Sequence, residues 1–103
     1  MERYAFTLRL KDESVVEEYE RLHLDVGDEV RAAHTRAGYR NYSIFRSGLT
    51  LFGYFEAEDP SGCATRISTE PIMAEWWAKT NPLMETDNGK PYFRRIPELF
   101  HMD

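Results

Sequence analysis

The order of two kinds of hydrophobic periodicity limits this chain of 103 residues to very few folds. Residues 3–10 alternate apolar and polar side chains, which predicts a half-buried strand. Its apolar face holds Tyr4, Phe6, Leu8 and Leu10. Residues 39–58 predict two more strands joined at Ser47-Gly48, where the glycine favours a tight hairpin turn. The tail Ile96–Met102 predicts a last strand.

A first helical pattern separates the first two strands. It predicts a helix from about Ser14 to Ala37, because apolar residues recur there at spacings of three and four. Asp12 or Ser14 is the predicted N-cap. Gly38 is a natural C-cap, since a glycine adopts the left-handed conformation that often ends a helix.

A second helical stretch precedes the last strand. Residues 62–71 predict a short helical piece, after which Thr69 caps a longer helix with Pro71 in its first turn. Asn81-Pro82 ends this helix, because a proline restricts the residue before it and lacks a backbone N–H. Asn88-Gly89 then marks a turn.

The resulting order, β-α-β-β-α-β, predicts an α+β, ferredoxin-like split β-α-β fold. Residues 1–103 form a single domain of this kind, with both helical stretches on one face of an antiparallel sheet. The other face also carries apolar side chains such as Phe52, and the chain has no further element to cover it. We therefore predict a homodimer in which two sheets pack face to face and form a dimeric α/β barrel.

Charge and composition exclude several classes of partner. The net charge of −5 argues against a nucleic-acid backbone or an anionic membrane surface. No apolar run approaches the ~20 residues that span a bilayer, and the first residues do not read as a secretory signal. A single cysteine, Cys63, predicts a reducing, cytoplasmic setting. Without a phosphate-binding glycine loop or a metal-ligand spacing, we predict no cofactor and no metal, and a small neutral ligand.

The apolar stripe of the first helix contains two residues that are able to do chemistry. Tyr19 and His23 lie four residues apart, so they touch on the inward face. Two interpretations stay open: a histidine satisfied within a core, or one wall of a pocket. A histidine pKa suits acid–base work near neutral pH. His34 is predicted to be solvated, and His101 is compatible with either core or surface.

Aromatic residues strengthen the pocket interpretation. Trp76 and Trp77 are the only tryptophans and are adjacent, and neighbouring helical side chains point about 100° apart. We predict that one anchors its helix in the core and the other forms the wall of a site. With Tyr19, His23 and Tyr42 of the second strand, a tryptophan would line an aromatic pocket with one titratable group. Such a pocket suits a small neutral ligand and a proton-transfer step.

Four stretches of the sequence carry a resemblance to a known family. They are RYAFTLRLKDESVVEEYERLH, NYSIF, EPIMAEWWAKTNPLME and ELFHM. In this order, over nearly the whole chain, they resemble the L-rhamnose mutarotases. The most specific elements are the tyrosine one turn before a histidine in EYERLH and the paired tryptophans. The family carries a Trp-containing, proline-rich segment after the histidine; here Gly27 and Asp28 stand in its place, which predicts a helix break at Gly27 and a restart capped by Asp28.

The resemblance implies a fold, an activity and residue roles. It implies a ferredoxin-like domain that dimerises through its sheets and an isomerase that interconverts the α and β anomers of a pyranose, L-rhamnose or a related 6-deoxy sugar. His23 would be the general acid–base residue. Tyr19, Tyr42, Trp76 and Trp77 would contact the sugar. No metal, nucleotide or other cofactor is implied.

Two other classes share the predicted fold. One is a dimeric α+β-barrel monooxygenase or haem-handling protein, which can also use histidine, tryptophan and asparagine. The other is a non-catalytic, stress-responsive dimer in which His23 would be fully packed. Because fold alone does not choose among these functions, the environment of His23 becomes the deciding feature.

Overall fold

The computed structural model describes all residues from Met1 to Asp103. Its α-helices are α1 Val16–His23, α2 Asp28–Ala37, α3 Pro60–Ile67 and α4 Pro71–Thr80, and its 3-10 helices are η1 Glu13–Val15 and η2 Asn81–Leu83. Its strands are β1 Glu2–Arg9, β2 Arg40–Ser47, β3 Thr50–Ala57, β4 Thr86–Asp87, β5 Lys90–Pro91 and β6 Arg94–Ile96. No helix is both long and apolar enough to cross a membrane.

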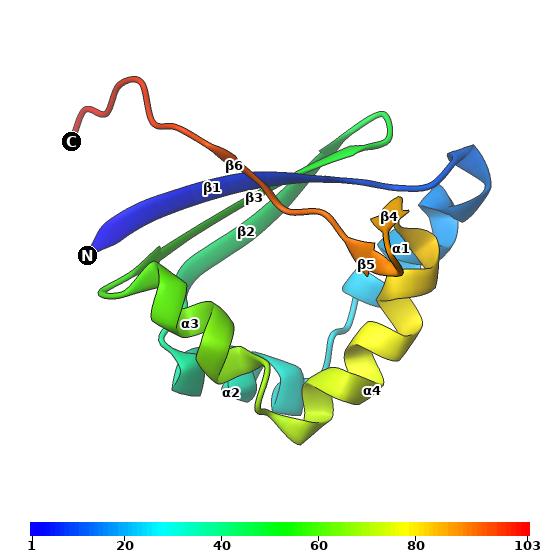
Figure 1. Cartoon of the computed structure of the whole chain (residues 1–103), viewed down its shortest axis with the longest axis horizontal. Helices are drawn as coiled ribbons and strands as arrows, with labels where there is room; N and C mark the ends of the chain where they lie inside the picture. The colour runs from blue at the N-terminus through cyan, green and yellow to red at the C-terminus, as the bar shows by residue number, and fades with distance from the viewer.

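The main sheet has the strand order β2-β3-β1-β6, and every pairing in it is antiparallel. Figure 1 shows the α-helices gathered on one side of this sheet, while no element covers its other side. This arrangement confirms the predicted ferredoxin-like α+β fold. The hairpin predicted at Ser47-Gly48 joins β2 to β3, with Gly48 at a φ of 60°.

The first predicted helix is interrupted, so its continuous span to Ala37 was wrong. The chain leaves α1 after His23 and enters α2 at Asp28, and Gly27 between them has a φ of 86°. The predicted break at Gly27 is confirmed. Gly27 itself is the N-cap of α2, and Asp28 is the first helical residue, so the capping role predicted for Asp28 was wrong. Gly38 ends α2 with a φ of 105°, as predicted.

Two other boundaries differ from the prediction. Thr69 does not cap α4, because its hydroxyl donates to the carbonyl of Arg66 at 2.7 Å and Glu70 occupies the N-cap position. The last strand is β6, Arg94–Ile96, and not the predicted tail that follows it. Pro97 ends the pairing with β1, because a proline has no backbone N–H to donate to a ladder.

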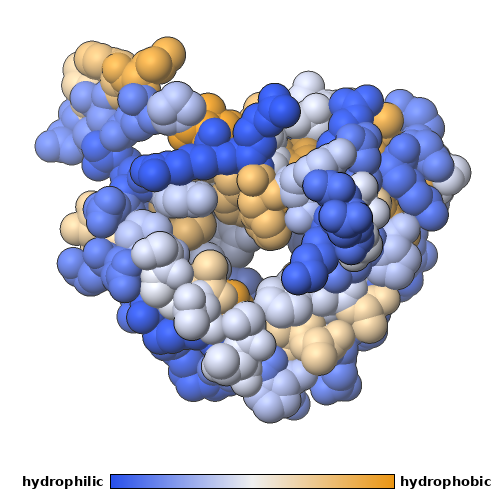
Figure 2. Space-filling view, in the orientation of Figure 1, coloured by the Kyte–Doolittle hydropathy of each residue, from blue (hydrophilic) through white to orange (hydrophobic).

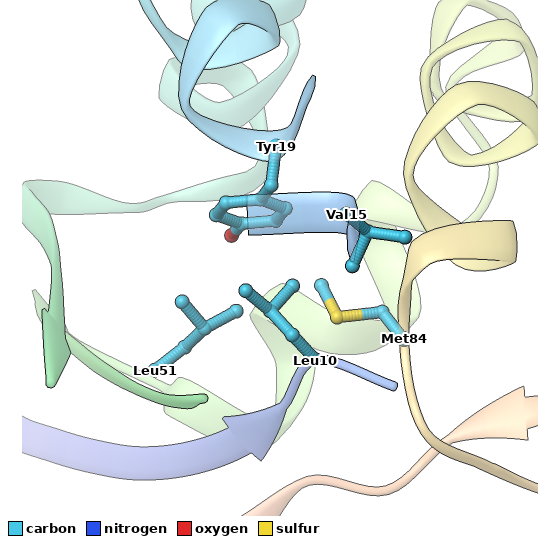
Figure 3. Close-up of a cluster of buried hydrophobic side chains, with 5 residues drawn as sticks. All are labelled: Leu10, Val15, Tyr19, Leu51 and Met84. Carbon is cyan, nitrogen blue, oxygen red and sulfur yellow. The ribbon is translucent and has the colours of Figure 1, made fainter. Parts of the chain in front are cut away.

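The core lies between the helices and the sheet face that they cover. One of its clusters consists of Leu10, Val15, Tyr19, Leu51 and Met84 (Figure 3). Figure 3 shows Tyr19 extending from α1 toward Leu10 and Leu51, which come from the sheet side. Cys63 is fully buried in a neighbouring cluster with Phe6 and Phe55. These contacts fix α1 to the sheet and thereby set the position of His23, one turn after Tyr19.

The opposite face of the sheet carries large apolar side chains that nothing covers. Phe45 and Phe52 pair directly across β2 and β3, and they are 64% and 39% exposed. Tyr54 and Ile96 lie on the same face by strand register. We call this surface the open face. Its exposed apolar side chains lie beside polar ones such as Glu56, which accepts a hydrogen bond from Tyr54.

Candidate active site

Tyr19 and His23 form a stacked pair on α1. Their ring centroids lie 4.2 Å apart with planes inclined by 29°. The Nδ1 atom of His23 lies 2.8 Å from the backbone oxygen of Tyr19, and a carbonyl oxygen accepts only, so Nδ1 carries the proton. The Nε2 atom of neutral His23 therefore presents a lone pair.

Trp76 completes a cluster around this histidine. It reaches His23 from α4 with an edge-on geometry and a centroid distance of 5.3 Å. Nε2 of His23 has no hydrogen-bond partner in the protein. Every side-chain nitrogen or oxygen that is shielded from solvent in a buried or half-buried residue does have a partner. His23 is one of these half-buried residues, so its Nε2 is open to solvent. The same holds for the hydroxyl of buried Tyr19, which also has no partner.

The surroundings set the protonation of both groups. Burial lowers the pKa of His23 below its ordinary 6.5, although the hydrogen bond to the Tyr19 carbonyl opposes this shift. The imidazole is therefore neutral at pH 7 and can accept a proton. Burial raises the pKa of Tyr19 to about 12, so its hydroxyl remains a hydrogen-bond donor. A neutral base and a neutral donor thus lie side by side.

Strand alternation places Tyr42 on the helix-facing side of the sheet together with Ile44, and a β-bulge interrupts the pairing just before it. Arg40 pairs with Glu56 and Ser43 with Tyr54, so Asn41 and Tyr42 together oppose the single residue between those partners. Asn41 has a φ of 51°, which accommodates the extra residue. The Tyr42 ring consequently packs near Phe55, at 5.7 Å between centroids, and near Phe6, at 6.4 Å.

The Tyr42 side chain lies in a largely aromatic environment, within ring contact of Tyr39, His34 and Phe55. Burial raises the pKa of Tyr42 well above its ordinary value, and Tyr39 and Tyr19 raise it further. The residue nevertheless keeps 37% of its surface exposed. A side chain that is surrounded by protein atoms and still reached by water lines a recess. Tyr42 and the Tyr19–His23 pair thus come from two elements that lie on the same, helix-covered side of the sheet.

Figure 2 shows an opening between the sheet and the helices near the centre of the molecule. We call this opening the central hollow. By strand register, Phe6 and Ile44 lie on the helix-facing side of the sheet, where both pair with Gly53. The Phe6 ring lies across Gly53, where an added Cβ would come within 2.2 Å of a ring carbon. Ile44 pairs with Gly53 and keeps 39% of its surface exposed. The missing side chain at Gly53 lets the Phe6 ring lie low on the sheet, where the Phe93 ring also packs against it at 5.1 Å between centroids.

Both tryptophans are half-buried and pack against the same core cluster around Met73, so the predicted division between a core anchor and a site wall is not seen in their burial. Trp76 contacts His23, whereas Trp77 borders a separate cavity of about 660 Å³ with Lys11 and Asn81. The core position on this part of α4 belongs to Met73, which is 1% exposed. A tryptophan as the buried anchor of α4 was therefore wrong, because Met73 already fills that position.

His34 was predicted to be solvated, and the structure places it elsewhere. It is half-buried, and its ring lies 5.0 Å from the Tyr39 ring and 5.5 Å from the Tyr42 ring. The signal was present in the sequence, because His34 follows Val30 by four residues and so continues the inward stripe. No cluster of three or more His, Cys, Asp or Glu residues is arranged to hold a metal ion.

Comparison with known proteins gives a consistent result. The family model described as L-rhamnose mutarotase matches residues 3–102. An L-rhamnose mutarotase from Oceanobacillus iheyensis is 37% identical over 90 residues, covering 84% of this chain and 86% of the relative. Another, from Lachnoclostridium phytofermentans, is 34% identical, with 100% of both chains covered.

Solved structures show the same fold. The L-rhamnose mutarotase from Formosa agariphila superposes with a TM-score of 0.81 at 23% identity, covering 100% of both chains. A dimeric ferredoxin-like protein from an uncultured marine organism has a TM-score of 0.61 at 14% identity, covering 96% of this chain and 97% of that one. At these identities the likeness speaks to the fold alone.

Proposed function

The chain belongs to the L-rhamnose mutarotase family, and from this premise we propose that it interconverts the α and β anomers of L-rhamnose in the central hollow. It is an isomerase. The match over residues 3–102, which takes in every residue of the Tyr19–His23–Trp76 cluster, carries this conclusion. The solvent-open Nε2 of His23 supports the acid–base role and disfavours the alternative of a fully packed histidine.

The reaction asks for two proton movements on a sugar. Nε2 of neutral His23 takes the proton of the anomeric hydroxyl, the bond between C1 and the ring oxygen breaks, and a C1 carbonyl forms. The ring oxygen takes up a proton from water or a neighbouring hydroxyl. Attack of that oxygen on the opposite face of C1 reverses these steps and gives the other anomer. A positioned acid–base group contributes about 10²–10⁴-fold to such a step.

Aromatic side chains supply the binding surface. We assign Tyr19 and Tyr42 to hydrogen bonding with sugar hydroxyls, because their raised pKa values keep both as neutral donors. Trp76 offers a ring wall beside His23, against which the C–H face of a sugar packs. A sugar contact for Trp77 stays a prediction, since its ring borders the neighbouring cavity.

We further propose that the protein is a homodimer that buries its open face. Phe45 and Phe52 supply the apolar centre of that face, and two sheets packing across it would form the barrel. The dimeric ferredoxin-like neighbour supports this assembly. Cys63 is free and buried, which fits the reducing, cytoplasmic setting predicted from the sequence.

Saturation-exchange NMR between the two anomeric protons tests the function. The panel is L-rhamnose, L-fucose, L-mannose and D-glucose, each with and without protein. We expect the largest acceleration of anomer exchange for L-rhamnose. Equal exchange rates with and without protein for every sugar would overturn the proposed function, and acceleration of another sugar alone would reassign its substrate.

A further inference from the structure

His34 repeats on α2 the local geometry of His23 on α1. Its Nδ1 lies 2.8 Å from the backbone oxygen of Val30, four residues earlier, just as Nδ1 of His23 lies 2.8 Å from Tyr19. That carbonyl accepts only, so Nδ1 of His34 carries the proton and Nε2 presents the lone pair. Nε2 has no partner in the protein, and because His34 is half-buried, this atom is open to solvent.

The ring of His34 lies beside the proposed sugar contact Tyr42. Its centroid is 5.5 Å from that of Tyr42 and 5.0 Å from that of Tyr39. Burial lowers the pKa of His34, with the bond to the Val30 carbonyl opposing the shift, so the imidazole is neutral at pH 7. Neutral, and with its N–H engaged by the backbone, it can only accept a hydrogen bond at Nε2. Its aromatic neighbours offer it no hydrogen bond in the protein.

The strand register separates the two histidines along the sheet. Tyr19, which stacks on His23, packs on Leu51, and Tyr42, which contacts His34, packs near Phe55. Gly53 lies midway between these two residues of β3. Along the sheet, the Tyr42–His34 pair is thus offset from the Tyr19–His23 pair by the span from Leu51 to Phe55, on the same helix-covered face.

We propose that His34 is a second sugar-binding residue of this site, accepting at Nε2 a hydrogen bond from a ring hydroxyl remote from the anomeric carbon. This inference rests on the proposed function, since it requires the sugar to be anchored at His23. A site that hydrogen-bonds a hydroxyl discriminates strongly against an analogue that lacks it. His34 would thus help to determine which sugars bind.

Two substitutions at His34 separate an acceptor from a packing residue. His34→Leu keeps much of the volume and removes the acceptor, whereas His34→Gln keeps an acceptor near the same place. His101→Leu, in the exposed tail, is the matched control. Exchange NMR gives kcat and KM for L-rhamnose and for its analogues that lack the hydroxyl at C2, C3 or C4. Melting temperatures report whether each variant folds.

We expect His34→Leu to raise KM for L-rhamnose about tenfold and leave kcat nearly unchanged, with His34→Gln in between. One deoxy analogue should bind wild type and His34→Leu equally well. In wild type, the 15N resonance of His34 Nε2 should move when L-rhamnose is added, a readout that needs no variant to fold. An unmoved resonance, an unchanged KM, or an equal loss for all four sugars would overturn the inference while leaving the mutarotase function standing. Absence of L-rhamnose exchange in wild type would instead remove the function on which it rests.

Discussion

The two faces of the central sheet carry similar aromatic side chains and differ in what lies above them. On the helix-facing side, Phe6 is 3% exposed and lies across Gly53, whereas Phe45 on the open face is 64% exposed. The helices that cover the first face also bring His23 and Trp76 to it. No helix covers the open face, whose polar groups include the hydrogen bond from Tyr54 to Glu56 and the ion pair of Arg3 with Glu98. Chemistry and assembly are thus assigned to opposite sides of one four-stranded sheet.

A matched pair of phenylalanine substitutions, one on each face of the sheet, should give the largest difference between the two faces. Phe6→Ala should lower the free energy of unfolding by about 3–5 kcal/mol, because it removes a buried ring and leaves a cavity. Phe45→Ala should change the unfolding of an isolated monomer little, yet raise the dimer dissociation constant about tenfold or more. Chemical denaturation and analytical ultracentrifugation measure these effects, and wild type should sediment as twice 12.1 kDa. A stable wild-type monomer at micromolar concentration would contradict the role given to the open face.

Gly53→Ala should sharpen the account of the hollow. The new methyl group would meet the Phe6 ring at 2.2 Å, so the ring must rise into the space above the sheet. We expect a loss of about 1–3 kcal/mol in the free energy of unfolding, the usual range for overpacking. Adding Phe6→Leu should relieve part of that clash. If the losses of unfolding free energy from Gly53→Ala and Phe6→Leu were additive in the double variant, Phe6 would not lie across Gly53 in solution.

The adjacent tryptophans offer a smaller contrast on one helix. Trp76→Ala should weaken L-rhamnose binding about tenfold, because it removes the wall beside His23. Trp77→Ala should weaken it less, because that ring borders the other cavity. Calorimetric titration of both variants, with Trp76→Phe and Trp77→Phe as partial replacements, measures the difference. A larger loss of affinity at Trp77 would place the sugar on the other side of α4.

The smallest expected effect is the dependence of stability on pH. Burial lowers the pKa values of His23 and His34 below 6.5, so the unfolded chain binds more protons than the folded one just below that pH. The free energy of unfolding should therefore fall as the pH drops through about 6.5 toward the folded pKa values, and the slope from these groups should vanish about one pH unit above 6.5. The double variant His23→Asn, His34→Asn should flatten this segment. Carboxylates whose pKa values are lowered by hydrogen bonds, such as Glu56 and Glu70, change the stability only at pH values near and below their ordinary pKa of 4.5. If the dependence of the unfolding free energy on pH persisted in the double variant, other titratable groups would be its cause.

The sequence predicted the layout of the fold and one side of the site. Alternation in residues 3–10 and 39–58 specified strands and faces, and the spacing of Tyr19 and His23 specified their contact, because both depend on local periodicity. The bulge at Asn41 and the position of Phe6 over Gly53 depend on neighbours distant in sequence. His34 was misjudged because the polar residues around it on α2 hid its place beside Tyr42, which only the tertiary fold supplies.

The central claim is that the open Nε2 of His23 moves the proton of the anomeric hydroxyl in the hollow. Exchange NMR with L-rhamnose on His23→Ala, with His101→Ala as the exposed-histidine control, tests it most directly. We predict that His23→Ala remains folded, still binds L-rhamnose and loses about 10²–10⁴-fold of the catalysed exchange rate. His101→Ala should match wild type. Exchange by folded His23→Ala at close to the wild-type rate would show that His23 is structural and that the chemistry lies elsewhere.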